Sequence, residues 1–262
     1  MKAGINVWTW GTASVAQFEQ SLREVSDIGY QYVENIGSIA DVCADAGEFD
    51  RLLARYGVQM VCAYYHLSGD DGQDRERLER YVSFMQAHRI LLMNVQAAPR
   101  PKSGITPSEL AKTADALARV SERARKAGIV PCLHPHYGTQ VERAPELAYV
   151  MEHVDRNLLA LTVDTGHAVL GGMDPVATCR QYADRVRYMH VKDIQAQRDA
   201  GQAWYAGFRE LGRGVVDFPG VKAVLETAGF DGYLCVELDK PRICGYKSAL
   251  ISRQYLREEL GI

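Results

Sequence analysis

The sequence of 262 residues contains no apolar run that approaches the roughly 20 residues needed to span a bilayer. Near its N-terminus a single lysine precedes an apolar stretch broken by polar residues, so we expect neither a signal peptide nor a membrane anchor. The six cysteines are scattered, the closest pair is nine residues apart, and no Cys-x-x-Cys spacing exists. We therefore expect reduced thiols in a cytoplasmic protein and no structural zinc site built on thiolates.

A strong excess of one charge is also absent. Thirty Lys and Arg residues against 33 Asp and Glu residues give a net charge of −3, which argues against nucleic acid or an anionic membrane as the main partner. The hydrophobic fraction of 47% and the charged fraction of 24% are those of a globular protein and exclude disorder. A Gly-x-Gly-x-x-Gly turn is missing after the first apolar run, where an open dinucleotide-binding sheet would carry it.

What the chain does contain is a regular alternation of short apolar runs with longer amphipathic segments. Eight runs are rich in β-branched or aromatic residues and are bounded by Gly or Pro: 3–9, 30–36, 58–66, 90–98, 129–134, 159–164, 186–192 and 233–239. Most gaps between them have helical periodicity. Eight strands that alternate with helices form a parallel sheet, either closed or open and doubly wound. Without the dinucleotide fingerprint, we predict one (β/α)8 TIM barrel that spans residues 1–262 as a single domain.

Local signals agree with this alternation. Thr106-Pro107-Ser108-Glu109 predicts a helix start, with Thr106 as N-cap and Glu109 closing a capping box. A glycine stands just before several predicted strands, where a left-handed residue ends the preceding helix: Gly29, Gly57, Gly128 and Gly229. The longest gap contains residues 193–216 and is the best place for a substantial active-site loop.

Polar side chains collect at the C-terminal ends of the predicted strands, where such a barrel has its active site. Carboxylates and imidazoles gathered in this way are typical of a site for Mn²⁺, Mg²⁺, Co²⁺ or Zn²⁺. The alternative is that these groups only cap helix N-termini. The residues concerned are Glu34, His66, Gln96, His134, His136, Asp164, His167, His190, Lys192, Glu237 and Asp239.

Four of these strand-end segments resemble the sugar phosphate isomerase/epimerase family, whose members are xylose isomerase-like barrels: residues 133–142, 163–168, 189–193 and 236–239. Residues 212–218 and 229–233 are similar to that family's approach to its last strand, so the similarity covers nearly the whole chain. The segment from His134 to Thr139 looks particularly like that of inosose (keto-inositol) dehydratases.

The resemblance implies one divalent metal, with Mn²⁺ as the first choice, held by Glu142, Asp164, His190 and Glu237. Asp164, His190 and Glu237 match their motifs directly. At the end of the fifth strand many relatives have a glutamate where this chain has His134. We favour Glu142 reaching back from the loop as the fourth ligand, with His134 or His136 as the alternative.

This set of residues suits proton abstraction next to a carbonyl group, because a metal stabilises the enediolate that forms. We expect Glu142 and Glu237 to remove and return the proton. Substrate hydroxyls, an oxyanion or a sugar ring would be bound by the remaining site residues, which are His134, His136, His167, Lys192, Trp8 and Tyr64. Packing at the end of the barrel is the alternative for each aromatic residue, and a salt bridge is the alternative for Lys192.

The predicted function is that of a metal-dependent isomerase or epimerase of a ketose or a related polyhydroxy carbonyl compound. The first alternative is a dehydratase of a keto-inositol or similar keto-polyol, and a remote one is a non-catalytic sugar-binding barrel. An abasic-site nuclease on this barrel needs a further histidine after the seventh strand, and none follows His190. We expect a small carbohydrate or keto-polyol as partner, no nucleic acid and no membrane; a homo-oligomer stays open.

Overall fold

The computed structural model describes residues 1–262 except residues 12, 38, 44–45, 198–200 and 242. Parallel strands close into a barrel in the order β1-β10-β7-β6-β5-β4-β3-β2, which confirms the predicted (β/α)8 TIM barrel. Seven of the eight barrel strands lie within a predicted run, and β1 begins one residue before its run 3–9. Their bounds are β1 Lys2–Asn6, β2 Tyr32–Ile36, β3 Gln59–His66, β4 Leu92–Gln96, β5 Val130–Leu133, β6 Ala160–Asp164, β7 Val186–Val191 and β10 Tyr233–Val236.

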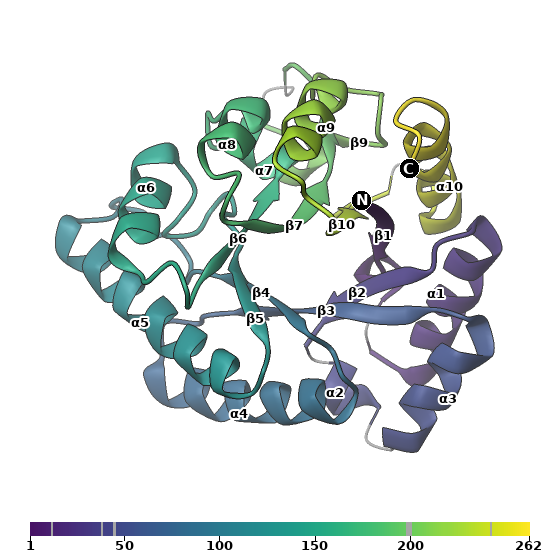
Figure 1. The fold of residues 1–262 in the computed structure, drawn as a ribbon, viewed down its shortest axis with the longest axis horizontal. Coiled ribbons are helices and arrows are strands. Elements are labelled where there is room, and N and C mark those ends of the chain that lie inside the picture. Colours follow the sequence, from purple (N-terminus) through teal and green to yellow (C-terminus); the bar gives the residue numbers. More distant parts are fainter. Residues whose placement is uncertain (12, 38, 44–45, 198–200, 242) are drawn as a thin grey trace.

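Helices surround the barrel in a ring (Figure 1). Because they cover the outer face while side chains fill the interior, the strands are buried on both faces and read as continuous apolar runs. The helices are α1 Val15–Ile28, α2 Ile39–Val42, α3 Ala46–Tyr56, α4 Asp71–Ala87, α5 Pro107–Lys126, α6 Ala144–His153, α7 Thr165–Leu170, α8 Pro175–Gln181, α9 Phe218–Thr227 and α10 Gly245–Glu258. None of these described helices is both long and apolar enough to cross a membrane.

Two signals that the sequence predicted for helix ends, a capping box and a left-handed glycine, are present in the structure. Thr106 caps α5 and forms the predicted capping box: Glu109 N donates to Thr106 Oγ1 at 3.2 Å, and Thr106 N donates to Glu109 Oε2 at 2.7 Å. Gly29 ends α1 with φ at 95°, a left-handed conformation in which a Cβ would be strained.

The long segment after β7 carries structure that the sequence did not predict. It contains the two-stranded antiparallel pair β8 (Asp193–Ile194) and β9 (Phe208–Arg209) and the 3₁₀ helix Trp204–Gly207. Ile194 and Phe208 are buried with Leu238, which follows β10. The segment is therefore packed onto the C-terminal end of the barrel beside β7 and β10.

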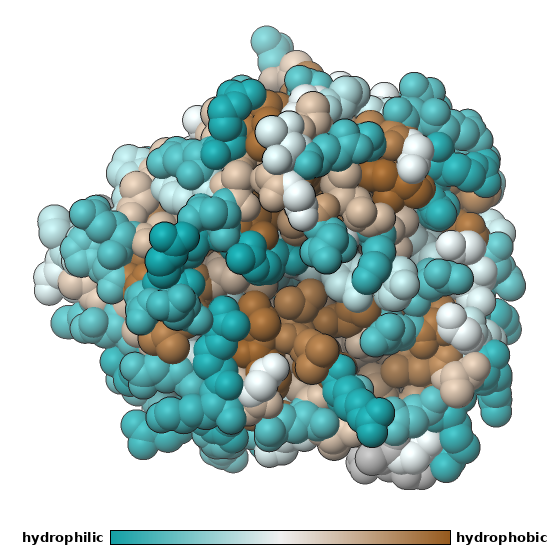
Figure 2. All heavy atoms as spheres, in the orientation of Figure 1, coloured by the Kyte–Doolittle hydropathy of each residue, from teal (hydrophilic) through white to brown (hydrophobic). Residues whose placement is uncertain are grey.

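The N-terminal end of the barrel is built from apolar and thiol side chains. Val61, Cys62, Cys132, Ala160, Tyr188 and Cys235 form one buried cluster inside it. On the surface in front of them is a hollow with a hydrophobic floor and a hydrophilic rim, near the centre of Figure 2. The cavity measures about 560 Å³; Leu91, Leu92 and Val130 are among its apolar lining residues, and Arg89 and Arg187 among its charged ones.

Candidate active site

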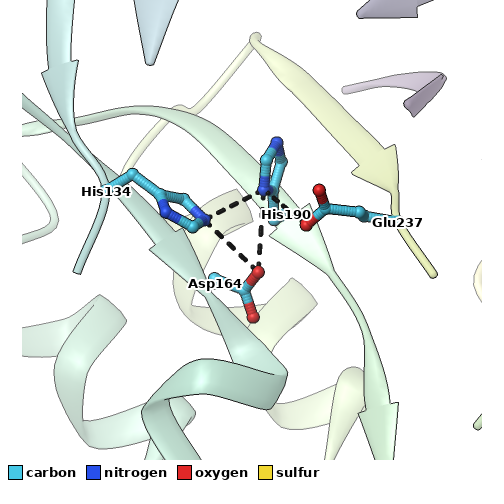
Figure 3. A group of neighbouring side chains, drawn as sticks. All are labelled: His134, Asp164, His190 and Glu237. Carbon is cyan, nitrogen blue, oxygen red and sulfur yellow. Dashed lines mark hydrogen bonds and ion pairs between the residues drawn. The ribbon is translucent and has the colours of Figure 1, made fainter. Parts of the chain in front are cut away.

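Four buried side chains converge at the C-terminal end of the barrel (Figure 3). His134, Asp164, His190 and Glu237 each offer one ligand atom, and these atoms all lie within 4.8 Å of one another. His190 Nδ1 lies 3.0 Å from His134 Nε2, 3.1 Å from Glu237 Oε2 and 3.6 Å from Asp164 Oδ2. We call these four residues the central cluster.

Strand order and register explain this convergence. The cluster residues follow or end β5, β6, β7 and β10, which are consecutive neighbours in the barrel. Asp164 pairs directly with His190 in the β6–β7 ladder, and Glu237 N donates to Val191 O at 3.3 Å, just beyond β10. Asp164 is also the N-cap of α7: its Oδ1 accepts from His167 N at 2.8 Å, which leaves Oδ2 facing the cluster.

Lys192 supplies the positive charge beside these carboxylates. Its fully buried Nζ lies 2.8 Å from Glu237 Oε2, 2.8 Å from Asp239 Oδ2 and 3.5 Å from Asp164 Oδ2. Burial, the largest single influence, would raise the pKa of Asp164 and Glu237, but the Lys192 ammonium and the neighbouring histidines together hold both pKa values well below the usual range. Burial would lower the pKa of Lys192, and the three carboxylates instead raise it well above its usual value.

The histidines of the site fall into two electrostatic classes. Burial lowers the pKa of His134 and His167, and lowers that of His136 to about 3, so these rings are neutral near pH 7. His190 is the exception: burial opposes its charged form, but the Glu34 and Glu237 carboxylates raise its pKa well above the usual value. In the metal-free protein a proton on His190 therefore offsets part of the surrounding negative charge.

The donor set of the central cluster fits a divalent cation. Two imidazole nitrogens and two carboxylate oxygens are ligands that Zn²⁺, Mn²⁺ and Co²⁺ accept. Asp164, Glu237 and Asp239 surround the Lys192 ammonium, and Glu34 adds a fourth carboxyl group on the other side of His190. A divalent cation would offset charge that Lys192 leaves uncompensated.

Glu142 is placed differently from the expectation that it completes this ligand set. Its Oε2 accepts from Gly138 N at 2.7 Å, and its Oε1 pairs with Arg143 Nε at 3.1 Å and Arg100 Nε at 3.5 Å. Within the part of the chain that the structure describes, Glu142 belongs to no cluster of side chains close enough together to share a metal ion. Glu142 as the fourth ligand stays a prediction, and His134, the alternative that the sequence left open, stands with the other three residues.

Tyr64, expected to contact substrate, holds His134. The Tyr64 hydroxyl lies 3.1 Å from His134 Nδ1 and donates to Gln96 Oε1. Because that hydroxyl gives its proton to Gln96, the contact with His134 is satisfied when Nδ1–H donates to it. His134 Nε2 then presents a lone pair to the central cluster.

His136 and His167 form a second layer over the cluster, with ring centroids 3.7 Å apart. Trp204 of the long loop packs against both rings, with centroids 5.5 Å from His136 and 5.4 Å from His167. His167 Nε2 lies 3.3 Å from Lys192 Nζ. Ligand atoms of His136, His167 and Asp239 lie within 4.8 Å of one another, and the binding of substrate hydroxyls by these two histidines stays a prediction.

Trp8 lies in the 3₁₀ helix Trp8–Trp10 that follows β1. Its backbone N donates to Asn6 Oδ1 at 3.0 Å, and Asn6 Nδ2 donates to Glu237 Oε1 at 3.2 Å. The indole Nε1 is buried, and no described residue accepts its hydrogen bond. Trp8 therefore stands near the site with an unused donor.

Sequence reasoning placed Glu34 among the polar strand-end residues without a specific role and did not single out Asn94 or Thr162; all three are buried. Glu34 Oε2 lies 2.6 Å from His190 Nε2, and Asn94 Nδ2 donates to Glu34 Oε1 at 2.9 Å. The available signal was a polar residue in the middle of an apolar run, as Asn94 is in Leu92-Met93-Asn94-Val95.

Comparison with known proteins agrees with this architecture. The family model described as "Xylose isomerase-like TIM barrel" matches residues 22–259. The chain belongs to that family. Among its sequence relatives, an inosose dehydratase of Geobacillus kaustophilus is 29% identical over 91% of this chain and 86% of its own length. An inosose dehydratase of Geobacillus thermodenitrificans is 34% identical over 56% of this chain and 54% of its own length.

Solved structures share the fold at low identity. IolI, in a structure with a bound zinc atom, superposes with a TM-score of 0.81 at 16% identity and covers 98% of this chain and 97% of its own. An L-ribulose 3-epimerase superposes with a TM-score of 0.79 at 19% identity and covers 100% of this chain and 94% of its own. The proteins to which this chain is similar are thus named both as dehydratases and as an epimerase.

Proposed function

We propose that the central cluster holds one divalent cation, with His134 in place of Glu142 as the fourth ligand. Support comes from the mixed imidazole and carboxylate donors within 4.8 Å of one another and from the excess of carboxylates around them. The zinc atom of the IolI structure, on the same fold, is consistent with this proposal. When bound, such a cation would act as a Lewis acid toward a substrate carbonyl oxygen.

The reaction that we propose is dehydration of a polyhydroxylated ketone of the inosose type. Dehydration requires a base for the carbon-bound proton and a proton donor for the departing hydroxyl. One observation carries the proposal: Lys192 Nζ lies 2.8 Å from both Glu237 Oε2 and Asp239 Oδ2, so base and proton donor are in direct contact.

Glu237 and Lys192 carry the proton transfers of this reaction. Glu237 takes the proton from the carbon next to the ketone, and the electron pair left behind expels the hydroxyl from the following carbon. Lys192 donates a proton to that hydroxyl, which leaves as water. The proton on Glu237 then passes to Lys192 across their 2.8 Å contact and restores both groups. His136 and His167 orient the other hydroxyls of the ring.

The sequence favoured an isomerase or epimerase, with Glu142 and Glu237 as paired bases. That mechanism needs two carboxylates on opposite sides of one carbon. The ion pairs of Glu142 with Arg100 and Arg143 give that carboxylate another role. The curated relatives named inosose dehydratase, one of them aligned over 91% of this chain, favour the lyase.

The test loads the protein with Mn²⁺, Co²⁺ or Zn²⁺ and incubates it in D₂O with an inosose or with ketohexoses. NMR follows deuterium uptake next to the ketone and loss of water. We expect water loss from the inosose and no epimerised ketohexose. Epimerised ketohexose without water loss from the inosose would support the isomerase or epimerase prediction instead.

A matched pair of lysine variants tests the proton donor. Lys192→Met should stop water loss while proton exchange next to the ketone continues, because Glu237 is still present. Lys222→Met, at a lysine on α9 that pairs with Glu226 outside the site, should change neither rate. Asp239→Asn should slow water loss with a smaller perturbation of the fold, and circular dichroism verifies each variant. Unchanged water loss in both site variants would refute the assignment of Lys192.

A further inference from the structure

Both ring nitrogens of His190 are engaged, on opposite sides of the ring. Nδ1 faces the central cluster, and Nε2 lies 2.6 Å from Glu34 Oε2. Both residues are 0% exposed. Since an ionised carboxylate only accepts hydrogen bonds, the ring nitrogen on that side must carry a hydrogen.

Behind Glu34 the contacts continue through two more buried residues. Asn94 Nδ2 donates to Glu34 Oε1 at 2.9 Å, and the Thr162 hydroxyl donates to Asn94 Oδ1. Glu34, Asn94 and Thr162 come from β2, β4 and β6, which are alternate strands of the barrel. Side chains from alternate strands form one layer of a TIM-barrel interior. Here that layer is polar and lies directly beside His190.

Asn94 Nδ2 also lies 3.1 Å from His190 Nε2, but the shorter 2.6 Å contact between Nε2 and Glu34 Oε2 determines the donor and acceptor roles. The hydroxyl of Thr162 can donate to Asn94 Oδ1, so the amide NH₂ of Asn94 turns toward Glu34. Glu34 then accepts from Asn94 and from His190 Nε2–H. Neutral imidazole carries one N–H, so His190 with Nε2–H has its lone pair on Nδ1, which points into the cluster.

We infer that Glu34 is a positioning residue that fixes His190 as an Nδ1 ligand, with Asn94 and Thr162 holding Glu34 in turn. This inference rests on the proposed metal site. A carboxylate that accepts from the outer N–H of a ligating histidine fixes its tautomer and ring orientation and increases its strength as a ligand. His134 is held in a matching way through Tyr64, but by a neutral hydroxyl instead of a carboxylate.

The test measures Zn²⁺ affinity by competition with a chromophoric chelator and the His190 tautomer by ¹⁵N NMR of the Zn²⁺-loaded protein. Glu34→Gln should weaken binding about 10- to 100-fold, the usual effect of losing such a partner. In its NMR spectrum His190 should no longer be purely the Nε2–H tautomer, which is the form that we expect in the unaltered protein. Glu210→Gln is the matched control, because Glu210 is also a buried glutamate but accepts from Ser248, and both readouts should stay unchanged.

Thr162→Val is the second variant and carries the test if Glu34→Gln does not fold. It keeps the shape of the side chain and removes only the hydroxyl that orients Asn94, so we expect a loss of a few-fold in Zn²⁺ affinity. Affinity within twofold of the unaltered protein in every folded variant, with an unchanged tautomer, would overturn the inference. Failure of the unaltered protein to bind any divalent metal would instead overturn the proposed function.

Discussion

The two ends of the barrel interior are formed by the same strands and have opposite chemistry. At the C-terminal end, Glu34, His190 and Lys192 are each 0% exposed and are surrounded by further charged groups. At the N-terminal end, the interior is filled by Cys62, Cys132 and their apolar neighbours. Each buried charge at the first end is tolerated because another group at that end pairs with it.

This difference assigns separate tasks to the two ends. Apolar side chains in contact favour the folded state regardless of pH or metal, whereas buried ionisable groups make stability depend on both. The register joins the two chemistries at one level of the barrel, since Cys235 of β10 pairs with His190 of β7. A substitution at the C-terminal end should affect metal binding and catalysis. A substitution at the N-terminal end should affect the free energy of unfolding alone.

The largest expected effect comes from Asp164→Asn. Asparagine keeps the oxygen that caps α7 and removes the carboxylate charge that faces His134 and His190. Metal affinity should fall by more than the roughly 10- to 100-fold typical of an outer-shell partner. Isothermal titration with Zn²⁺ or Mn²⁺ measures it. Asp174→Asn changes an equivalent N-cap on α8 outside the site and should leave affinity unchanged. Equal affinities for the two variants would remove Asp164 from the ligand set.

Glu237→Gln comes next. Glutamine keeps the size and one ligand oxygen of Glu237 but cannot take up the substrate proton. Proton removal by a positioned carboxylate contributes about 10²- to 10⁴-fold, so turnover and deuterium exchange should fall on that scale even at saturating metal. NMR in D₂O measures both rates. Exchange at nearly the parent rate would leave Glu237 as a ligand only, and the base would then be sought among His134, His136 and Glu142.

The alternation of runs and gaps was enough to predict the barrel, because burial on both faces makes each strand an apolar run that a turn signal ends. It also located Asp164, His190 and Glu237, since parallel strands of one barrel bring their C-terminal ends together. Loop residues are harder to place. Glu142 is separated from its strand by a loop whose path depends on contacts with Arg100 and Gly138, and the sequence does not display those contacts.

The polar layer of Glu34, Asn94 and Thr162 was missed for another reason. Consecutive members are 60 and 68 residues apart in sequence and meet only because barrel closure brings alternate strands together across the interior. A single polar residue within a strand has many ordinary explanations, and only the hydrogen bonds of the folded chain distinguish them. The unpredicted pair β8 and β9 is only two residues long on each side, too short for a periodic pattern.

The buried ionisable groups at the C-terminal end of the barrel should also make the stability of the metal-free protein sensitive to acid. The folded-state pKa of His136 is about 3, lowered first by burial and then by His134 and Lys192, against about 6.5 unfolded. Between these values the unfolded chain binds a proton that the folded chain does not, so stability falls as the pH decreases from 7 toward 3. The lowered pKa values of His134 and His167 act in the same direction, and the raised pKa of His190 opposes them.

His136→Gln measures that contribution. A difference of one bound proton changes the free energy of unfolding by about 1.4 kcal/mol per pH unit. Between pH 6 and 4 the slope of the free energy of unfolding against pH should therefore be smaller in the variant than in the parent by roughly that amount. Urea unfolding at several pH values gives the slopes. His153→Gln, at an exposed histidine on α6, should keep the parent slope. Equal slopes for all three proteins would show that His136 is not held neutral by the fold.

The smallest effect is expected at the other end, from Tyr188→Phe. Tyr188 is 0% exposed, and no nitrogen or oxygen in the described part of the chain forms a hydrogen bond with its hydroxyl. The Cys235 thiol beside this hydroxyl is only a weak hydrogen-bond partner. Burial of the hydroxyl therefore costs free energy, and removing it should raise the free energy of unfolding, by about 1 kcal/mol. Tyr65→Phe is the matched control: that hydroxyl donates to Asp74 O at 2.7 Å, so its removal should destabilise by about as much. The ring of Tyr188 lies 5.7 Å from that of His190, yet Tyr188→Phe should leave metal affinity unchanged. A tenfold change in affinity would show that the two ends are coupled, because the hydroxyl would then be contributing to the orientation of His190.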